Sequence, residues 1–438
     1  MKPVRKPHVV ALCSPNRSRL EHLRKLWALR KRYEITCCRV GPGMGWERLF
    51  VDHDVEIPEA ARCAPGRAAI DLLDLIGTPD AIINFSEAYV PLHAELCERY
   101  GLVGPSDMAV RVGRNKLHMR EFCAQLGIPG PRFAVATERN LVDAAGLSYP
   151  VVIKPAIGCS STLVERLESH DHLVRRFPEI HAVALTVYGR ELLFQEAIRE
   201  FGDFPFIVEE LIDGEVQFCT RLPYQIGEIS VESVAYDGRT TILAIHDAPV
   251  ASNGPFYEKI VNSTPTRIPA PLVQLATNYV TRLHEALGPG AYVLHTEMRT
   301  FADGLMPLEF GVRIGGSSLY RSVLHSTGND FVEILIQLGL GQSPHLSNQP
   351  ACPTITHYVV PRSSGRITRI TGWAKVPTSP FCVDHQLYDD IGDLVRRPPL
   401  RSRASGYFAL RGDCFDDLEQ ETIRLLGDID IEVQALLS

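Results

Sequence analysis

The chain has 438 residues, which predicts roughly three domains at about 150 residues each. Its composition (45% apolar, 22% charged and 8% aromatic residues) excludes disordered, collagen-like and coiled-coil proteins. The net charge of -7 provides no overall positive surface for nucleic acid or an acidic membrane. We therefore expect small-molecule partners, with no nucleic acid and no membrane partner.

The N-terminus and the cysteines indicate the cellular compartment. The N-terminus lacks the apolar segment of a signal peptide, and no apolar run approaches the roughly 20 residues that span a bilayer. The 11 cysteines are scattered, without a CxxC or a Cys/His spacing typical of zinc sites. We expect reduced, buried thiols in a cytoplasmic protein.

The first part of the chain predicts an α/β domain with a parallel sheet. An apolar run at 8–13 predicts a strand, and leucines at helical spacing over 20–29 predict the helix that follows it. The same pattern returns with a strand at 80–85 and a helix near 89–100.

The remainder has α+β character. The expected elements are a helix over 115–126, a strand at 149–154 with a small-residue loop at 156–162, strands at 206–212, 229–235 and 241–246, a helix near 271–287, strands at 292–301 and 305–310, and a helix over 329–338. A proline-rich break near 344–353 separates a last segment of short strands, turns and a closing helix.

Two acidic residues lie on the strand pair LHTEMRTF and LMPLEF, which Ala-Asp-Gly at 302–304 joins in a tight turn. With the turn centred on Asp303, Glu297 lies opposite Glu309, with Cβ atoms about 4.5–5.5 Å apart. Such carboxylates repel each other unless they share divalent cations, and two Mg²⁺ ions about 3.5–4 Å apart require such a pair. The alternative is an exposed strand pair neutralised by Arg299 or another cation.

The residues after Glu309 add groups suited to anions. They are Gly311, Arg313, Gly315 and Gly316. Arginine offers a planar fork of donors to phosphoryl or carboxylate oxygens, and glycines let the backbone approach a reacting centre. The combination indicates phosphoryl transfer, and its alternative is an ordinary surface turn.

Two lysines are candidates for binding phosphate. Lys154 ends an apolar strand and precedes a loop of small residues that includes Ser160 and Ser161. Such a loop can fold its N–H groups over phosphate oxygens while the lysine supplies a point charge. The alternative is a plain strand-end lysine, and Lys116, at the start of a predicted helix, has a weaker signal still.

The strand near residue 210 is a candidate for binding a nucleoside. Its last residues, Glu209, Glu210 and Leu211, can present backbone groups to an adenine edge, and Glu215 can accept hydrogen bonds from ribose hydroxyls. The alternative is a strand with surface acids.

In order, these segments resemble the ATP-grasp superfamily. The matching segments are NKLHMREFCAQLGIPGPRF, YPVVIKPAIGCSST, FIVEELIDGEV, ISVESVAYDG and LHTEMRTFADGLMPLEFGVRIGG. Within the superfamily the chain looks most like the L-amino acid ligases, through GPFYEKIVNSTPTRIP, STGNDFVEILIQLGLG and PRSSGRITRITG. The resemblance implies an ATP-grasp fold of the α/β and α+β class.

The resemblance also implies four units. They are an N-terminal parallel-sheet domain at 1–112, a linker helix and mobile lid subdomain at 113–206, a core with the metal and phosphate site at 207–345, and a C-terminal extension of the mixed-sheet core at 346–438.

Roles follow from the resemblance residue by residue. It assigns Lys116, Lys154, Ser160 and Ser161 to the phosphates of ATP, Glu209, Glu210 and Leu211 to adenine, Glu215 to ribose, and Glu297 and Glu309 to Mg²⁺, as two ions. Arg313 would contact the transferring phosphoryl group and the acyl phosphate, Gly315 and Gly316 would border the acceptor site, and Glu258 would receive a substrate ammonium.

Three departures from the family pattern concern the site. Gly311 stands where many relatives have Asn, the loop lacks a glycine often found near Thr162, and 246–248 reads His-Asp-Ala where a lysine is often expected after the strand ending near Ile245.

The implied reaction joins a carboxylate to an amine through an acyl phosphate and converts ATP to ADP and phosphate. The leading hypothesis is a ligase that makes a dipeptide or an amino-acid amide, and the resemblance is compatible with a homodimer. Two alternatives stay open: activation of a side-chain (γ-glutamyl) or non-amino-acid carboxylate, and a non-catalytic nucleotide-binding relative.

Overall fold

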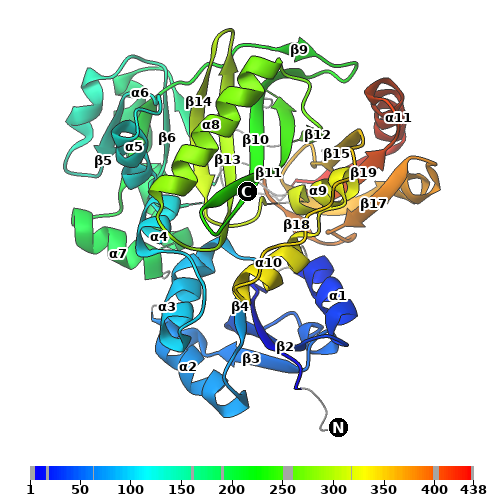
Figure 1. The fold of residues 1–438 in the computed structure, drawn as a ribbon. Coiled ribbons are helices and arrows are strands. Elements are labelled where there is room, and N and C mark those ends of the chain that lie inside the picture. Colours follow the sequence, from blue (N-terminus) through cyan, green and yellow to red (C-terminus); the bar gives the residue numbers. More distant parts are fainter. Residues whose placement is uncertain are drawn as a thin grey trace.

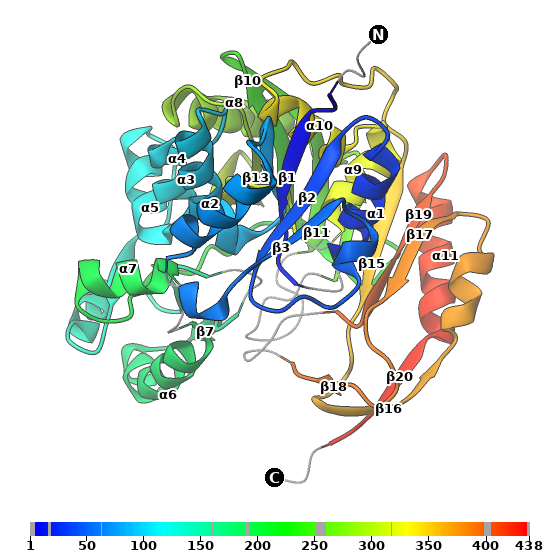
Figure 2. The same ribbon diagram turned by 90° about the horizontal axis from the view of Figure 1, so that it is seen from below.

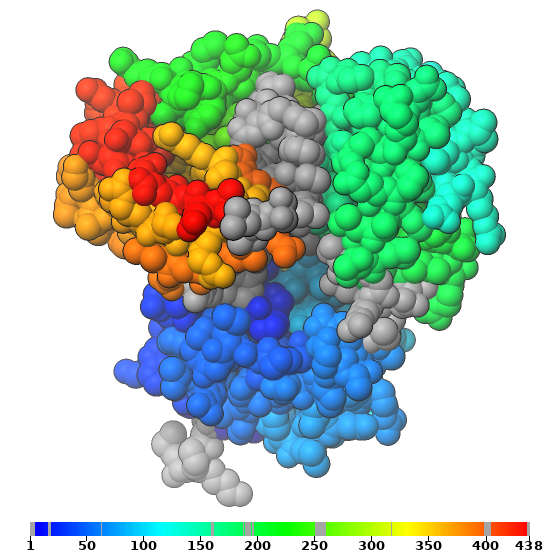
Figure 3. Space-filling view, turned by 180° about the vertical axis from the view of Figure 1, so that it is seen from behind, coloured from blue at the N-terminus to red at the C-terminus, as the bar shows by residue number. Residues whose placement is uncertain are grey.

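The computed structural model describes residues 5–15, 19–62, 64–158, 162–188, 192–249, 260–316, 318–397 and 404–435. Its lobes are the N-terminal domain, the lid and the C-terminal segment, arranged around a central sheet (Figures 1 and 3). No helix among the described residues is long and apolar enough to cross a membrane. The cysteines in these ranges are free thiols, and five of them are buried as expected, whereas Cys219 and Cys414 are exposed.

The N-terminal domain contains a four-stranded parallel sheet of order β3-β2-β1-β4. Its elements are β1 (His8–Leu12), α1 (Leu20–Leu29), β2 (Glu34–Val40), β3 (His53–Ile57), α2 (Pro65–Ile76), β4 (Ala81–Asn84) and α3 (Val90–Tyr100). β1 is buried throughout because helices cover both faces of the sheet (Figure 2). Val9 and Ala11 pack with α1, whereas Val10 and Leu12 pack with α2 and α3.

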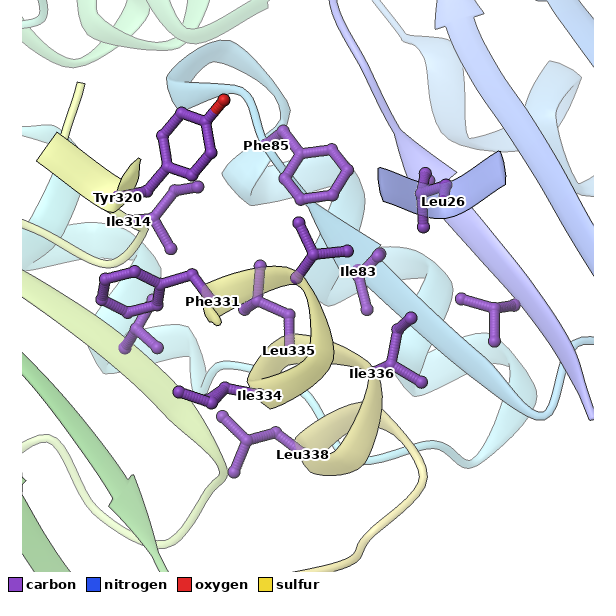
Figure 4. Packing of buried hydrophobic residues seen from close by; sticks show 14 of the residues in the cluster. Leu26, Ile83, Phe85, Ile314, Tyr320, Phe331, Ile334, Leu335, Ile336 and Leu338 are labelled. Carbon is purple, nitrogen blue, oxygen red and sulfur yellow. The ribbon is translucent and has the colours of Figure 1, made fainter. Parts of the chain in front are cut away.

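A helix from much later in the chain completes this packing. Side chains of α10 (Phe331–Gly339) join the cluster formed by α1 and β4, as Figure 4 shows around Leu26, Ile83 and Phe85. Burial of apolar surface therefore fixes the N-terminal domain against the segment that follows the acidic hairpin.

Two short helices connect the N-terminal domain to the lid. They are α4 (Asp107–Arg114) and α5 (Lys116–Gln125). The lid contains a four-stranded sheet of order β5-β8-β6-β7 and two helices. The strands are β5 (Phe133–Ala136), β6 (Val151–Pro155), β7 (Glu165–Leu167) and β8 (Phe206–Glu210), and the helices are α6 (His170–Tyr188) and α7 (Leu192–Phe201). The lid has its own apolar cluster. Because β8 pairs within the lid, the expected boundary between residues 206 and 207 cuts a lid strand.

The central sheet has nine strands, with the path β14-β13-β10-β11-β12-β15-β19-β17 and β9 paired to β10. Its strands are β9 (Phe218–Cys219), β10 (Gln225–Tyr236), β11 (Arg239–Pro249), β12 (Val261–Thr264), β13 (Tyr292–Phe301), β14 (Gly304–Gly311), β15 (Thr354–Val359), β17 (Cys382–Leu387) and β19 (Gly406–Arg411). Helices α8 (Ala270–Ala286) and α9 (Leu319–Thr327) pack against it.

The last segment combines strands of the central sheet with a smaller sheet. Its three strands are β16 (Gly365–Thr371), β18 (Leu394–Val395) and β20 (Asp430–Gln434), and α11 (Phe415–Asp428) packs beside them. The strands and helices that the sequence predicts are present in the structure. One expectation is wrong: the strand expected to end near Ile245 continues to Pro249, because β10 and β12 pair with it on both sides.

The hairpin confirms that Glu297 lies opposite Glu309, but through a different register from the one expected. Phe301 pairs with Gly304, so the turn is not centred on Asp303. That register alone would place Leu308 opposite Glu297. A bulge between the Met298–Pro307 and Glu297–Glu309 pairs inserts Leu308 and brings Glu309 into line.

Arg120 of α5 holds this bulge. Its Nη1 donates to Pro307 O (2.7 Å) and its Nη2 donates to Leu308 O (2.8 Å). Pro307 is tolerated because β14 is an edge strand, where a missing N–H costs no pairing. The linker helix therefore stabilises the register on which the acid pair depends.

Two helical glycines provide a test of the packing between α4 and the hairpin. A Cβ on Gly113 would lie 2.6 Å from Val312 Cγ2, whereas a Cβ on Gly427 in α11 would meet nothing within 4 Å. We expect Gly113→Ala to lower the free energy of unfolding by about 1–3 kcal/mol through overpacking. Gly427→Ala should raise it by up to about 1 kcal/mol, because alanine favours the helix. Thermal unfolding of both variants checks this, and equal shifts would contradict the close packing.

Candidate functional site

The two acids of the hairpin each have a cationic neighbour. Lys116 Nζ lies 3.2 Å from Glu309 Oε2, and His295 Nε2 lies 3.0 Å from Glu297 Oε1. Arg299, the neutralising cation that the sequence suggested, pairs with Glu228 instead (2.9 Å). The repulsion between Glu297 and Glu309 is therefore partly offset by Lys116 from α5 and His295 from β13.

Lys116 also contacts the loop of small residues. The side chain of Asn115 caps α5, and Lys116 Nζ donates to Gly158 O (3.0 Å) as well as pairing with Glu309. This lysine therefore connects the lid loop with the acidic hairpin.

Lys154 takes part in a buried ion-pair cluster. Its Nζ lies 2.6 Å from Glu209 Oε2, and Arg120 Nε pairs with the other oxygen of Glu209. Burial would raise the pKa of Glu209, but the charges of Arg120 and Lys154 outweigh it and lower that pKa to about 2. Glu209 therefore connects the lid strand to the helix that holds the hairpin bulge.

The expected adenine-binding residues have partners inside the lid. Glu210 N donates to Arg132 O (3.0 Å), and Leu211 N donates to Pro150 O (3.1 Å). In this conformation the two N–H groups are not available to an adenine edge. Glu215 is exposed, and its backbone exchanges hydrogen bonds with Thr300 on β13 (2.6 and 2.9 Å).

Arg313 lies on the wall of the site in an ion-pair cluster that the sequence did not reveal. Glu87 lies between Arg114 and Arg313, and each guanidinium pairs with one of its carboxylate oxygens. Burial opposes the charge of Glu87, but the two arginines outweigh it and lower its pKa to about 2. The available signal was an acid just beyond the carboxyl end of a parallel strand, where ligands bind in α/β sheets.

A small pocket brings these groups together. Its lining comes from α4, α5, the lid loop, the hairpin and the N-terminal domain, and includes Glu87, Arg114, Asn115, Lys116, Gly158, His295, Glu309, Gly311 and Arg313. Lys154 and Glu215 are not among its lining residues. Ser160, Ser161 and Glu258 lie outside the residues that the structure describes.

A second group missed by sequence reasoning lies behind Glu297. His295 Nδ1 contacts Glu232 Oε1, and Glu232 Oε2 accepts a hydrogen bond from Gly315 N (3.1 Å). Burial opposes protonation of His295, but Glu232 and Glu297 outweigh it and raise its pKa to about 9. The signal was the HTE triplet, because residues two apart on a strand share a face.

The structure shows the surroundings of two positions at which the chain departs from the family pattern. A Cβ on Gly311 would make only ordinary contacts, 3.4 Å from Glu87 Oε2 and 3.5 Å from Arg313 Cζ. His246 is buried in β11 and lies 3.1 Å from Ser322 Oγ through Nε2.

The acid pair suits Mg²⁺ that is bound together with a nucleotide. In the described part of the chain, no group of three or more His, Cys, Asp and Glu residues has the geometry to hold a metal ion by itself. Mg²⁺ is usually held by one or two carboxylates, with substrate phosphates and water completing the coordination. Glu297 and Glu309 fit that requirement.

The Glu87 cluster predicts a pH-dependent stability. The folded pKa of about 2 lies below the ordinary 4.5, so its stabilisation is complete above pH 4.5 and is lost as the pH falls towards 2. The difference corresponds to about 3 kcal/mol. We expect Glu87→Gln to lower the thermal unfolding midpoint at pH 7, by an amount that shrinks between pH 4.5 and pH 2. The exposed Glu98→Gln is the control, and a pH-independent loss would contradict the ion-pair explanation.

Comparisons with known proteins agree with this architecture. A model of the ATP-grasp domain matches residues 147–320, and a model of the L-amino acid ligase C-terminal domain 2 matches residues 357–434. The crystal structure of an L-amino acid ligase from Bacillus licheniformis superimposes with a TM-score of 0.81 at 22% identity, covering 98% of this chain and 100% of that one. The fold is therefore an ATP-grasp fold, as expected.

Curated relatives are similar over part of the chain. The L-arginine-specific L-amino acid ligase of Bacillus subtilis is 24% identical over 307 residues, which are 69% of this chain and 68% of that protein. An alanine–anticapsin ligase of Bacillus subtilis is 24% identical over 267 residues, which are 59% of this chain and 53% of that protein. The chain therefore contains an ATP-grasp domain over residues 147–320 and, over residues 357–434, a segment that matches the C-terminal domain of L-amino acid ligases.

Proposed function

We propose that the protein is an ATP-dependent carboxylate–amine ligase that joins two amino acids into a dipeptide or an amino-acid amide. The observation that carries the proposal is the single pocket in which Lys116, Glu309 and Arg313 meet, beside Glu297 on the facing strand. The similarity to L-amino acid ligases supports amino acids as the substrate class.

In the first step, a substrate carboxylate oxygen bonds to the γ-phosphorus of ATP while the bond to the bridging oxygen breaks, which gives an acyl phosphate and ADP. Glu297 and Glu309 would hold Mg²⁺, which when bound supplies positive charge to the phosphate oxygens. Lys116 and Arg313 would stabilise the negative charge on the transferring group.

In the second step, an amine nitrogen bonds to the acyl carbon as the phosphate leaves, and a proton is released from the nitrogen. Water must be kept away from the acyl phosphate, and closure of the lid over the pocket would do so. Lys154 would move with the lid strand β6 towards the phosphates. Glu258 remains our proposed contact for the substrate ammonium.

Removal of the central groups tests the reaction. We expect Glu309→Ala and Arg313→Ala each to lower the rate of ADP release by at least about 100-fold, because each removes charge stabilisation from the transition state. The measurement is ADP and phosphate release across amino-acid pairs, followed by mass spectrometry of the product. Glu285→Ala, an exposed acid on α8, is the control.

Three outcomes separate the candidates. A peptide or amide of two amino acids supports the proposal, and NMR of the product shows whether an α-carboxyl or a side-chain carboxyl was activated. ADP release only with carboxylates that are not amino acids would favour the broader ligase. ADP binding with no production of ADP from ATP for any amino-acid pair would favour a non-catalytic nucleotide-binding relative. Gly311 and the absence of a lysine after Ile245 make this the relevant second candidate.

Gly311 provides a separate prediction about the metal. Gly311 shares a strand face with Glu309, and a Cβ there meets no atom closer than 3.4 Å. We expect Gly311→Asn to fold normally and to lower the Mg²⁺ concentration that gives half-maximal ADP release by about threefold to tenfold, because the amide oxygen adds a ligand. Titration of Mg²⁺ at saturating ATP measures this. Gly311→Ala is the control, and an equal response of both variants would exclude ligation by the amide.

A further inference from the structure

Two rows of residues cross the central sheet beside the proposed metal site. One row is Ser230, Glu297 and Glu309, and the adjacent row is Glu232, His295 and Gly311. Since these positions are two residues apart on their strands, both rows share one face of the sheet. Glu232 is 0% exposed and His295 is 4% exposed, so the polar groups of the second row lie within the protein.

His295 bridges two carboxylates. Its Nδ1 faces Glu232 Oε1, and its Nε2 lies 3.0 Å from Glu297 Oε1. Each ring nitrogen of His295 therefore has a carboxylate oxygen as its partner. Its ring orientation is therefore fixed from both sides, and so is one oxygen of Glu297.

Glu232 extends this connection to the glycine loop. Its second oxygen accepts a hydrogen bond from Gly315 N (3.1 Å). A Cβ on Gly315 would lie 2.7 Å from Glu232 Oε1, so a larger residue would force the loop and the carboxylate apart. A continuous path of polar contacts thus runs from Gly315 through Glu232 and His295 to Glu297.

We propose that Glu232 and His295 are positioning residues that orient the carboxylate of Glu297 towards Mg²⁺ and fix the backbone of Gly315 relative to it. The inference rests on the proposed function, because it takes Glu297 as a metal ligand. It adds that the metal side and the acyl-phosphate side of the pocket are held in one alignment by the Glu232–His295 pair, of which His295 also lines the pocket.

A merely structural ion pair would stabilise the protein without changing how the metal contributes to nucleotide binding. A positioning role would change that contribution specifically, as loss of the outer partners of a metal ligand typically does. The informative measurement is therefore the gain in ADP affinity that Mg²⁺ provides.

The experiment compares His295→Gln and Glu232→Gln with His284→Gln in the full-length protein. His284 is a suitable control because it is also a buried histidine facing β10, where its Nε2 lies 2.9 Å from Ser233 Oγ, away from the acid pair. Calorimetry measures ADP binding with and without Mg²⁺. We expect the Mg²⁺-dependent gain to fall at least tenfold in His295→Gln and Glu232→Gln only, and ADP binding without Mg²⁺ to stay within about twofold of the wild type in Glu232→Gln and His284→Gln, which do not line the pocket.

The result that overturns the inference is a wild-type Mg²⁺-dependent gain in His295→Gln and Glu232→Gln. If His295→Gln does not fold, Glu232→Gln provides the same test, and failure of both to fold would show a structural role and also overturn it. Glu309→Ala distinguishes the two levels of the proposal. If Glu309→Ala keeps the full Mg²⁺-dependent gain in ADP affinity, the proposed metal site is wrong. If the gain is lost in Glu309→Ala but not in His295→Gln or Glu232→Gln, the metal-site proposal stands and the positioning role is rejected.

Discussion

The site depends on keeping two carboxylates of like charge opposite each other on one face of an edge hairpin. Glu297 and Glu309 repel in this position, and cations on either side reduce the cost: Lys116 from the linker helix and His295 from the same strand. The register that creates the pair comes from a bulge whose carbonyls Arg120 binds. The helix α5 therefore both aligns the acids and compensates one of them.

Two further carboxylates, the buried Glu209 and the partly buried Glu87, connect the separate units to this hairpin. Glu209 brings the lid strand β8 to Arg120, and Glu87 brings the N-terminal domain to Arg114 and Arg313. Each carboxylate has two cationic partners, which is the condition under which a buried charge is tolerated. Figure 4 shows the packing of α10 against the parallel sheet, which holds the N-terminal domain in place. The pocket is therefore a junction of three units rather than a feature of one domain.

The departures from the family pattern have different consequences in this geometry. Gly311 leaves room beside Glu309 and offers no side-chain ligand, so in the proposed site the protein would supply two carboxylates and substrate phosphates would supply more of the Mg²⁺ coordination. Residues 246–248 lie inside strand β11, where the buried carboxylate of Asp247 accepts a hydrogen bond from Arg267 N (2.9 Å).

The sequence by itself determined many of the strands and helices and the candidate site residues that lie on them or directly beside them in the chain. Apolar runs and helical spacing predicted many of the strands and helices, and the spacing of the two strands around Ala-Asp-Gly placed Glu297 and Glu309 on facing strands of one hairpin, because these signals act over a few residues. Only the tertiary structure decided the partners. Glu87, Glu232 and Arg120 each meet at least one group that is 63 or more residues away, and Leu308 joins a bulge that turn chemistry does not encode. Such contacts depend on how packed elements face each other, and that is fixed by the burial of whole surfaces rather than by any local pattern.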